Sequence, residues 1–198
     1  KMILFTPPTD RYLQGDPGTP VVLETLGGID AQVLVRTALV GKTELGTYRP
    51  PANTVFDDPG MSSDFTDVHL NRDADRHLAD SLHHADIVIT WASTMIIDAA
   101  VVDKPIILVG FDARPRAYGK SIQQYYDYDH QRHIIETGGV RLAKSPEELG
   151  EWVKRYLADP TIDAEGRKRI RDEHCGVLDG KAGERLGNYL LEKLEIRK

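Results

Sequence analysis

The chain has 198 residues, a formal net charge of −6 and a single cysteine, and 28% of its residues are charged. The negative balance argues against sequence-independent binding of nucleic acid, which depends on clustered Lys and Arg. A lone Cys175 excludes an internal disulfide and a cysteine-built metal site. No run approaches the roughly 18 apolar residues of a membrane span, and we expect a cytoplasmic protein with one domain.

Short β-branched runs alternate with amphipathic segments along the whole chain. The expected strands, in chain order, are residues 2–6, 31–39, 54–56, 87–89, 106–109 and 140–143. The expected helices are residues 19–26, 73–84, 93–102, 145–157, 164–173 and 181–194. This alternation is typical of a parallel α/β sheet. We therefore predict a single doubly wound, Rossmann-like domain over residues 1–198, with a mostly parallel sheet of about six strands flanked by helices.

The loop after the first strand, residues 9–20, leaves the carboxyl end of that strand. In a doubly wound sheet such loops line the ligand crevice. Arg11 is therefore placed to meet a phosphate, or it is an ordinary surface arginine; the residues alone leave both interpretations open.

The segment from Ala85 to Asp112 is expected to form a strand, a tight turn, a helix and a second strand. Ser93 and Thr94 lie where the helix begins, and free N–H groups at a helix N-terminus favour an anion. Asp98 lies one helical turn further and can hold ribose hydroxyls. These residues make a candidate nucleotide site; the alternative is that Ser93 and Thr94 only cap the helix and that Asp98 is solvated.

A long polar and aromatic stretch follows Asp112, and such loops at the carboxyl end of a strand are often functional. Its aromatic side chains can stack on a base or sugar: Tyr125, Tyr126 and Tyr128. Its basic side chains can meet phosphates: Arg114, Arg116, Lys120, His130, Arg132 and His133. Alternatively, residues 121–128 form an amphipathic helix that packs its tyrosines on the sheet. We expect no metal at His130 and His133, because further ligands are missing nearby.

Four segments resemble, in the same order, the nucleotide-binding half of two-Rossmann-domain (B-type) glycosyltransferases, and most of all the CDP-glycerol glycerophosphotransferase family. The first is ILFTPPTDR, which ends at Arg11. The second combines Ser93, Thr94 and Asp98 with the Lys104-Pro105 pair and Asp112. The remaining two are YYDYD at residues 125–129 and LDGKAGER at residues 178–185.

The resemblance implies a transferase that moves a glycosyl or polyol-phosphate group from a CDP- or UDP-linked donor to a cell-surface polymer or glycolipid. It covers one of the family's two domains, so we expect an excised C-terminal half, inactive alone, whose N-terminal acceptor domain supplies any peripheral membrane contact. No cofactor, metal or nucleic acid is expected, and no catalytic residue is identified. The expected donor-binding residues are Arg11, Ser93, Thr94, Asp98, Asp112, His130 and Arg132.

The chain departs from the family pattern after the second strand. The family continues there with a basic residue, Pro, His and Pro, whereas this chain has Arg36-Thr37-Ala38-Leu39. This difference bears on activity more than on fold, and it keeps a non-catalytic α/β interaction module open. A non-hydrolysing nucleotide-sugar epimerase is a further alternative with the same architecture. A dehydrogenase is disfavoured because no G-x-G-x-x-G follows the first strand.

Overall fold

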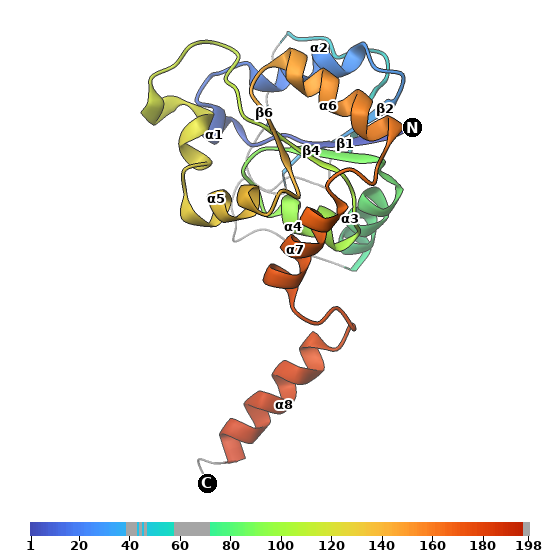
Figure 1. Ribbon diagram of the computed structural model, residues 1–198, viewed down its shortest axis with the longest axis vertical. Coiled ribbons are helices and arrows are strands. Elements are labelled where there is room, and N and C mark those ends of the chain that lie inside the picture. The colour runs from blue at the N-terminus through green and yellow to red at the C-terminus, as the bar shows by residue number, and fades with distance from the viewer. Residues whose placement is uncertain (39–42, 44, 46, 58–71, 196–198) are drawn as a thin grey trace.

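A computed structural model describes residues 1–38, 43, 45, 47–57 and 72–195 of the chain. At its centre is a six-stranded sheet in which all pairings are parallel and the strand order is β3-β2-β1-β4-β5-β6 (Figure 1). The strands are β1 (Met2–Thr6), β2 (Gln32–Arg36), β3 (Thr54–Asp57), β4 (Ile87–Thr90), β5 (Ile106–Val109) and β6 (Arg141–Ala143). The predicted fold class is confirmed.

The central strands are apolar on both faces because helices cover both faces of the sheet. Every residue of β4 and β5 is buried. Phe5 of β1 is in register with Val35 on one side and Ile89 on the other. β-branched and aromatic side chains suit such positions, since they pack well against neighbours on a pleated surface.

Two layers of helices enclose the sheet. In Figure 1, α2 and α6 lie on one face, and α3, α4, α5 and α7 lie on the other; α2 contacts α6, and α4 contacts α7. The helices are α1 (Asp10–Leu13), α2 (Gly18–Gly27), α3 (Arg72–His84), α4 (Met95–Val101), α5 (Asp129–Glu136), α6 (Pro146–Ala158), α7 (Ala164–Cys175) and α8 (Ala182–Glu195). Two short 3₁₀ helices, η2 (Tyr118–Lys120) and η3 (Ile122–Tyr125), precede α5.

The start of α6 shows how local sequence sets a helix boundary. Ser145 is the N-cap, and its Oγ accepts a hydrogen bond of 3.2 Å from the backbone N–H of Glu148. The Glu148 carboxylate in turn accepts a hydrogen bond of 2.8 Å from the backbone N–H of Lys144, and Pro146 lies in the first turn of the helix. Ser145 and Glu148 thus satisfy two backbone N–H groups where α6 begins, and the fixed φ of Pro146 suits the first helical turn.

Several expected boundaries differ from the structure. The second strand ends at Arg36 instead of continuing to residue 39, which lies outside the described residues, and residues 9–20 contain α1 and the start of α2. The helix expected over residues 93–102 is Met95–Val101. Residues 121–128 form η3 and a turn in place of an amphipathic helix, because Asp112 and Ser121 bind the backbone N–H groups of Ile122 and Gln123.

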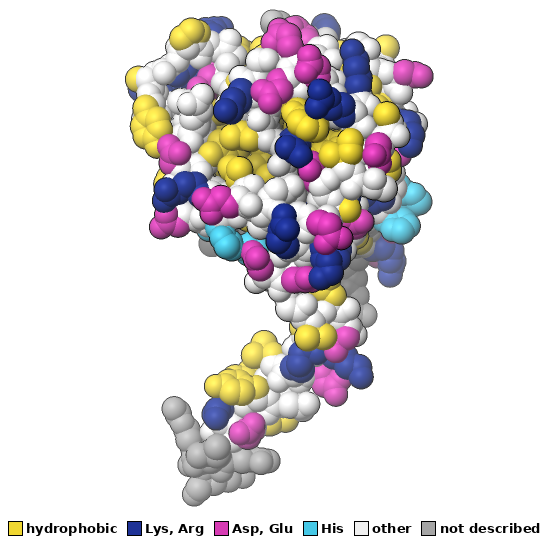
Figure 2. All heavy atoms as spheres, in the orientation of Figure 1, with side chains coloured by type: hydrophobic (Ala, Val, Ile, Leu, Met, Phe, Trp, Pro, Cys, Tyr) yellow, Lys and Arg dark blue, Asp and Glu magenta, His cyan; other side chains and the backbone are white. Residues whose placement is uncertain are grey.

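The last helix, α8, extends away from the body of the molecule (Figure 1). Hydrophobic side chains are visible along it in Figure 2, and Leu186, Tyr189, Leu190, Leu191 and Leu194 are all exposed. None of the helices that the structure describes has the length and apolar character needed to cross a membrane.

Candidate functional site

The strand order predicts a ligand crevice at the carboxyl ends of β1 and β4. The chain proceeds from β1 to β2 on one side of β1, whereas β4 lies on its other side, so the loops after β1 and β4 leave in opposite directions. Ligands of doubly wound sheets bind at such a reversal. Thr6 and Thr90 are paired at the ends of the two strands and mark the floor of this position.

The turn between β4 and α4 carries the first two predicted site residues. Ser93 Oγ accepts a hydrogen bond of 3.2 Å from the backbone N–H of Met95, so Ser93 caps the start of α4. Thr94 is the N-cap by position, its hydroxyl makes no capping bond, and its side chain is exposed. The two hydroxyls therefore differ: one serves the fold, and the other faces solvent at the helix N-terminus.

Asp98 lies in the first turn of α4, as expected from its spacing. It is exposed, yet the atoms packed around its carboxyl desolvate it and raise its pKa. The end of α7 lies beside it: the pKa of the Cys175 thiol is raised by desolvation and then by the Asp98 carboxylate, with Arg171 opposing. A carboxyl whose pKa is raised by desolvation is a candidate for function.

Arg11 belongs to α1, which follows the carboxyl end of β1. Its side chain is exposed and makes no hydrogen bond or ion pair with the part of the chain that the structure describes. The segment that contains α1 and the turn that holds Ser93 and Thr94 follow neighbouring strands, β1 and β4. The fold therefore places these predicted residues at one edge of the sheet.

Asp112 follows β5 and fastens the loop after it. Its Oδ2 accepts a hydrogen bond of 2.5 Å from Ser121 Oγ, and its Oδ1 accepts a second one of 2.9 Å from the backbone N–H of Ile122. Both carboxylate oxygens thus have partners within the protein. The structure gives Asp112 a role in loop conformation, and its contact with a donor stays a prediction.

His130 and Arg132 both lie on α5, and both are exposed. The His130 ring stacks on Tyr128, with centroids 5.9 Å apart, and Arg132 forms an ion pair with Asp129. Tyr128 in turn contacts Tyr125 at 6.0 Å, and Tyr125 contacts Tyr12 of α1 at 5.7 Å. A continuous aromatic row thus connects the loops that follow β1 and β5.

Polar contacts hold these two loops together across the end of β4. Arg116 donates to the carbonyl oxygens of Leu13 (2.6 Å) and Gln14 (3.3 Å). The backbone N–H of Ala113 donates a hydrogen bond of 2.9 Å to Asp16 Oδ1. Arg116, which the sequence offers as a phosphate contact, therefore fastens one loop to the other.

A group of charged residues that the sequence did not single out lies at the carboxyl ends of β2 and β3. Arg36 is buried and forms an ion pair with Asp57. His77 of α3 places its Nδ1 3.5 Å from Arg36 Nη1 and 3.6 Å from Asp57 Oδ1. These residues come from three separate elements, so no local spacing could have indicated the group.

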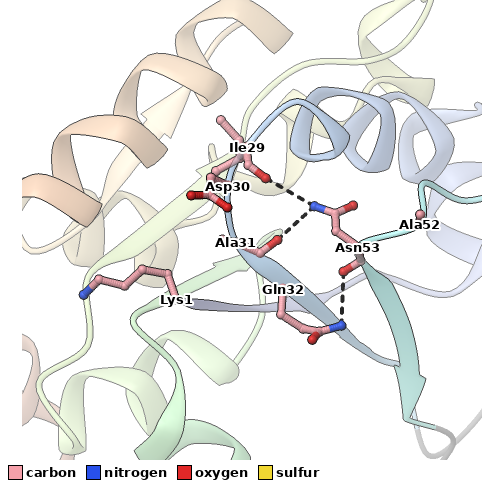
Figure 3. A pocket seen from close by; sticks show the side chains of 7 residues that line it. All are labelled: Lys1, Ile29, Asp30, Ala31, Gln32, Ala52 and Asn53. Atoms are coloured by element: carbon pink, nitrogen blue, oxygen red, sulfur yellow. Dashed lines mark hydrogen bonds between the residues drawn. The ribbon is translucent and has the colours of Figure 1, made fainter.

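The hollow drawn in Figure 3 lies at the opposite, amino-terminal edge of the sheet. It measures about 420 Å³, and Asp30, Gln32 and Asn53 are among its lining residues. The Asn53 amide donates to the carbonyls of Ala31 (2.9 Å) and Ile29 (3.4 Å). Because ligands of this architecture bind at the carboxyl edge, we assign the candidate site to the β1–β4 crevice. Within the described residues, no three His, Cys, Asp or Glu side chains gather as a metal site would require.

Comparison with known proteins identifies the family of the chain. Residues 55–192 match the family described as CDP-Glycerol:Poly(glycerophosphate) glycerophosphotransferase, and this stretch is more than half of the chain. The chain belongs to this family. The match spans Ser93, Thr94, Asp98 and Asp112, whereas Arg11 lies before it. A comparison with curated proteins gives no match.

Solved structures similar to this glycerophosphotransferase-family chain include glycosyltransferases. The wall teichoic acid polymerase TagF is 18% identical, with a TM-score of 0.58 over 100% of this chain and 44% of its own. The calicheamicin glycosyltransferase CalG4 is 13% identical, with a TM-score of 0.63 over 98% of this chain and 42% of its own. At these identities the likeness establishes a shared fold. The chain spans less than half the length of each, and family and fold together make it one of transferase type.

Proposed function

We propose that the chain binds a nucleotide-diphosphate donor, CDP- or UDP-linked, as the donor domain of a transferase. The group moved is a polyol phosphate or a glycosyl unit, and the acceptor is a cell-surface polymer or glycolipid. The observation on which this proposal rests is the turn before α4, where Thr94 is exposed at the helix N-terminus and Asp98 follows one helical turn later. Family membership of the same residues supports this proposal.

In the proposed complex the phosphates lie over the N-terminus of α4. Its free N–H groups and the positive end of its dipole favour negative charge. The Thr94 hydroxyl donates to a phosphate oxygen, and Arg11 reaches across from the loop after β1. These groups stabilise the charge that develops on the leaving phosphate as the transferred group departs. Asp98 accepts hydrogen bonds from the ribose hydroxyls.

The remaining predicted residues lie further from the turn. His130 and Arg132, on α5, and the row formed by Tyr12, Tyr125 and Tyr128 are proposed to contact the base or the transferred group. Asp112 contributes by holding the loop that carries them.

At the scale of the whole protein, we propose that residues 1–198 act as one nucleotide-binding domain. A separate N-terminal domain binds the acceptor and makes any peripheral contact with a membrane, and the protein works in the cytoplasm. The similar structures support this arrangement, since the chain covers 42% of CalG4 and 44% of TagF. One further match, solved with thymidine diphosphate, is the spinosyn rhamnosyltransferase SpnG, with 12% identity, a TM-score of 0.58 and coverage of 87% of this chain and 41% of its own.

Titration calorimetry with CDP, UDP and pyrophosphate tests the site. Losing one charge-assisted hydrogen bond to phosphate costs about 1.5–3 kcal/mol, or roughly one to two decades in affinity. We expect that loss for Arg11→Ala and Thr94→Val with CDP or UDP. Asp98→Ala should weaken CDP and UDP more than pyrophosphate, because only the nucleotides carry a ribose.

Arg155→Ala serves as the matched control, because Arg155 is an exposed arginine in the last turn of α6, at the other edge of the sheet. It should bind nucleotides as the parent does. Nucleotide affinities unchanged in all three site variants would refute the site. A parent chain that binds no nucleotide at saturating concentration would favour an interaction module instead.

An epimerase is a second candidate, supported by one similar structure. A putative UDP-N-acetylglucosamine 2-epimerase from Listeria monocytogenes is 13% identical, with a TM-score of 0.51 over 85% of this chain and 39% of its own. Incubation with UDP-N-acetylglucosamine and analysis of the sugar product separates the two. Epimerised sugar without transfer would favour the epimerase.

A further inference from the structure

Three buried side chains at the carboxyl edge carry polar atoms that have no partner in the described part of the chain. They are Asp16 Oδ2, Thr19 Oγ1 and Trp91 Nε1. The exposed fractions of these residues are only 8%, 2% and 2%. Buried polar groups in folded proteins almost always have a hydrogen-bond partner, so each of these atoms needs an explanation.

The three residues lie around Gly18, the first residue of α2. A Cβ placed on Gly18 would lie 3.3 Å from Asp16 Oδ1 and 3.7 Å from Trp91 Cζ2. Cζ2 is the ring atom beside the carbon that bears Nε1, so the indole N–H edge and the Asp16 carboxylate flank the same glycine. Thr19 is the next residue along α2.

The two orphaned groups are chemically complementary. An ionised carboxylate only accepts hydrogen bonds, and an indole N–H only donates one. Burying either the carboxylate oxygen or the indole N–H without a hydrogen-bond partner costs free energy. A hydrogen-bonded link between the two groups removes both costs. Thr19 can both donate and accept, so its hydroxyl is the competing partner for Asp16.

A link between Asp16 and Trp91 would join all three loops of the crevice. Asp16 lies between β1 and α2, and its Oδ1 already accepts from Ala113 N–H, in the loop after β5. Trp91 is the first residue after β4 and precedes Ser93 by two positions, and its ring packs on Phe5 of β1 at 5.5 Å. Trp91 therefore lies at the start of the turn that carries Ser93 and Thr94.

We infer that Asp16 is a positioning residue for the turn at residues 91–94. Its Oδ2 accepts a hydrogen bond from one internal water that in turn accepts from the Trp91 indole N–H, and this link sets the position of the N–H groups and the Thr94 hydroxyl that meet the ligand. What the turn binds rests on the proposed function, but the link itself exists without a ligand.

The link is tested on the ligand-free chain by following the indole N–H resonance of Trp91. Trp91 and Trp152 are the two tryptophans, so a Trp152→Phe background leaves one indole signal. We expect Asp16→Asn to shift this signal and to raise its hydrogen exchange about tenfold, because an amide nitrogen in the Oδ2 position cannot accept. Thr19→Val should leave it unchanged. An unmoved signal in Asp16→Asn, or equal shifts in both variants, would overturn the link.

The positioning role is tested by calorimetry with CDP or UDP on Asp16→Asn, Trp91→Phe and the double variant. Each single variant should bind roughly tenfold more weakly, and the double variant no more weakly than either, since both remove the same bond. Trp91→Phe keeps an apolar ring and provides the test if Asp16→Asn fails to fold, which circular dichroism detects. Unaltered nucleotide affinity in the single variants, or losses of affinity that add up in the double variant, would overturn the positioning role and leave the Asp16–Trp91 link untouched. A parent chain without nucleotide affinity overturns the proposed function and the positioning role together, whereas the link is decided by the indole resonance.

Discussion

At the scale of single residues, Asp98 links stability to the candidate site. Desolvation raises its pKa, so the charged form is disfavoured in the folded chain relative to the unfolded chain. The folded state therefore holds the proton more tightly, and stability falls as the pH rises through the unfolded pKa toward the folded one. Above that window, near neutral pH, the ionised Asp98 carries an unfavourable contribution, as functional sites often do.

Replacing Asp98 by Asn should raise the melting temperature at pH 7, because the amide removes the charge and keeps the shape. The gain should disappear near pH 3, below the roughly 3.9 of an unperturbed aspartate, where Asp98 is protonated in both states. Thermal unfolding of the parent and the variant at the two pH values measures this. Asp80→Asn, an exposed position of α3, is the control and should change little. A gain of equal size at both pH values would contradict the explanation.

At the scale of elements, the contact between α7 and the chain before β6 is made by three glycines. The backbone of Gly166, in the first turn of α7, lies directly against Gly138 and Gly139. The adjacent Arg167 is 1% exposed and ties α7 to its surroundings, donating to the carbonyl oxygens of Ile162 (2.6 Å) and Pro160 (2.9 Å). The same helix, α7, also packs against α4, which carries Asp98.

Gly166→Ala should destabilise the chain by about 1–3 kcal/mol or more, because overpacking of a filled contact forces backbone shifts. The added Cβ would lie 2.3 Å from the backbone of both Gly138 and Gly139. Gly183→Ala is the matched control, since a Cβ on this α8 glycine meets nothing within 4 Å. It should leave the global unfolding midpoint in urea unchanged and raise only the helicity of α8. Equal midpoints for the parent and Gly166→Ala would show that the contact is absent in solution.

At the scale of the whole molecule, the body and α8 should differ in stability. The sheet and its helices share one core, whereas α8 exposes its leucines (Figure 2). Leucines in the two regions therefore have different environments: Leu149 of α6 is 0% exposed, and Leu190 of α8 is 52% exposed.

Leu149→Ala should lower the free energy of unfolding by about 2–5 kcal/mol, the usual cost of a core leucine. Leu190→Ala should change it by less than about 0.5 kcal/mol. Urea unfolding of both variants at equal protein concentration measures the difference. A large loss for Leu190→Ala would mean that α8 packs against another surface in solution.

We also expect the chain alone to bind a donor nucleotide without turning it over. The candidate crevice lies at the open edge of a single sheet, and the chain spans 44% of TagF. Incubation with CDP-glycerol or a UDP-sugar, followed by nucleotide analysis, should show no release of CMP or UDP. Turnover at the rate of a complete enzyme would refute this expectation and show that the chain supplies its own catalytic groups.

The sequence alone determined the α/β class, the six strands and the edge at which the candidate residues lie. Short β-branched runs, capping residues such as Ser145 and the strand–helix alternation act over a few residues, so they can be read without a structure. Arg11, Ser93, Thr94 and Asp98 come to the same edge because the carboxyl ends of parallel strands meet there.

Only the tertiary structure decided what the individual side chains do there. It placed Ser93 in a cap, Asp112 and Arg116 in loop fastenings, and His77 beside Arg36. Partners such as Arg116 and Leu13 are 103 residues apart in sequence. Such contacts depend on how whole elements pack and not on local spacing, and a polar side chain binds whichever neighbour the fold brings within hydrogen-bonding distance.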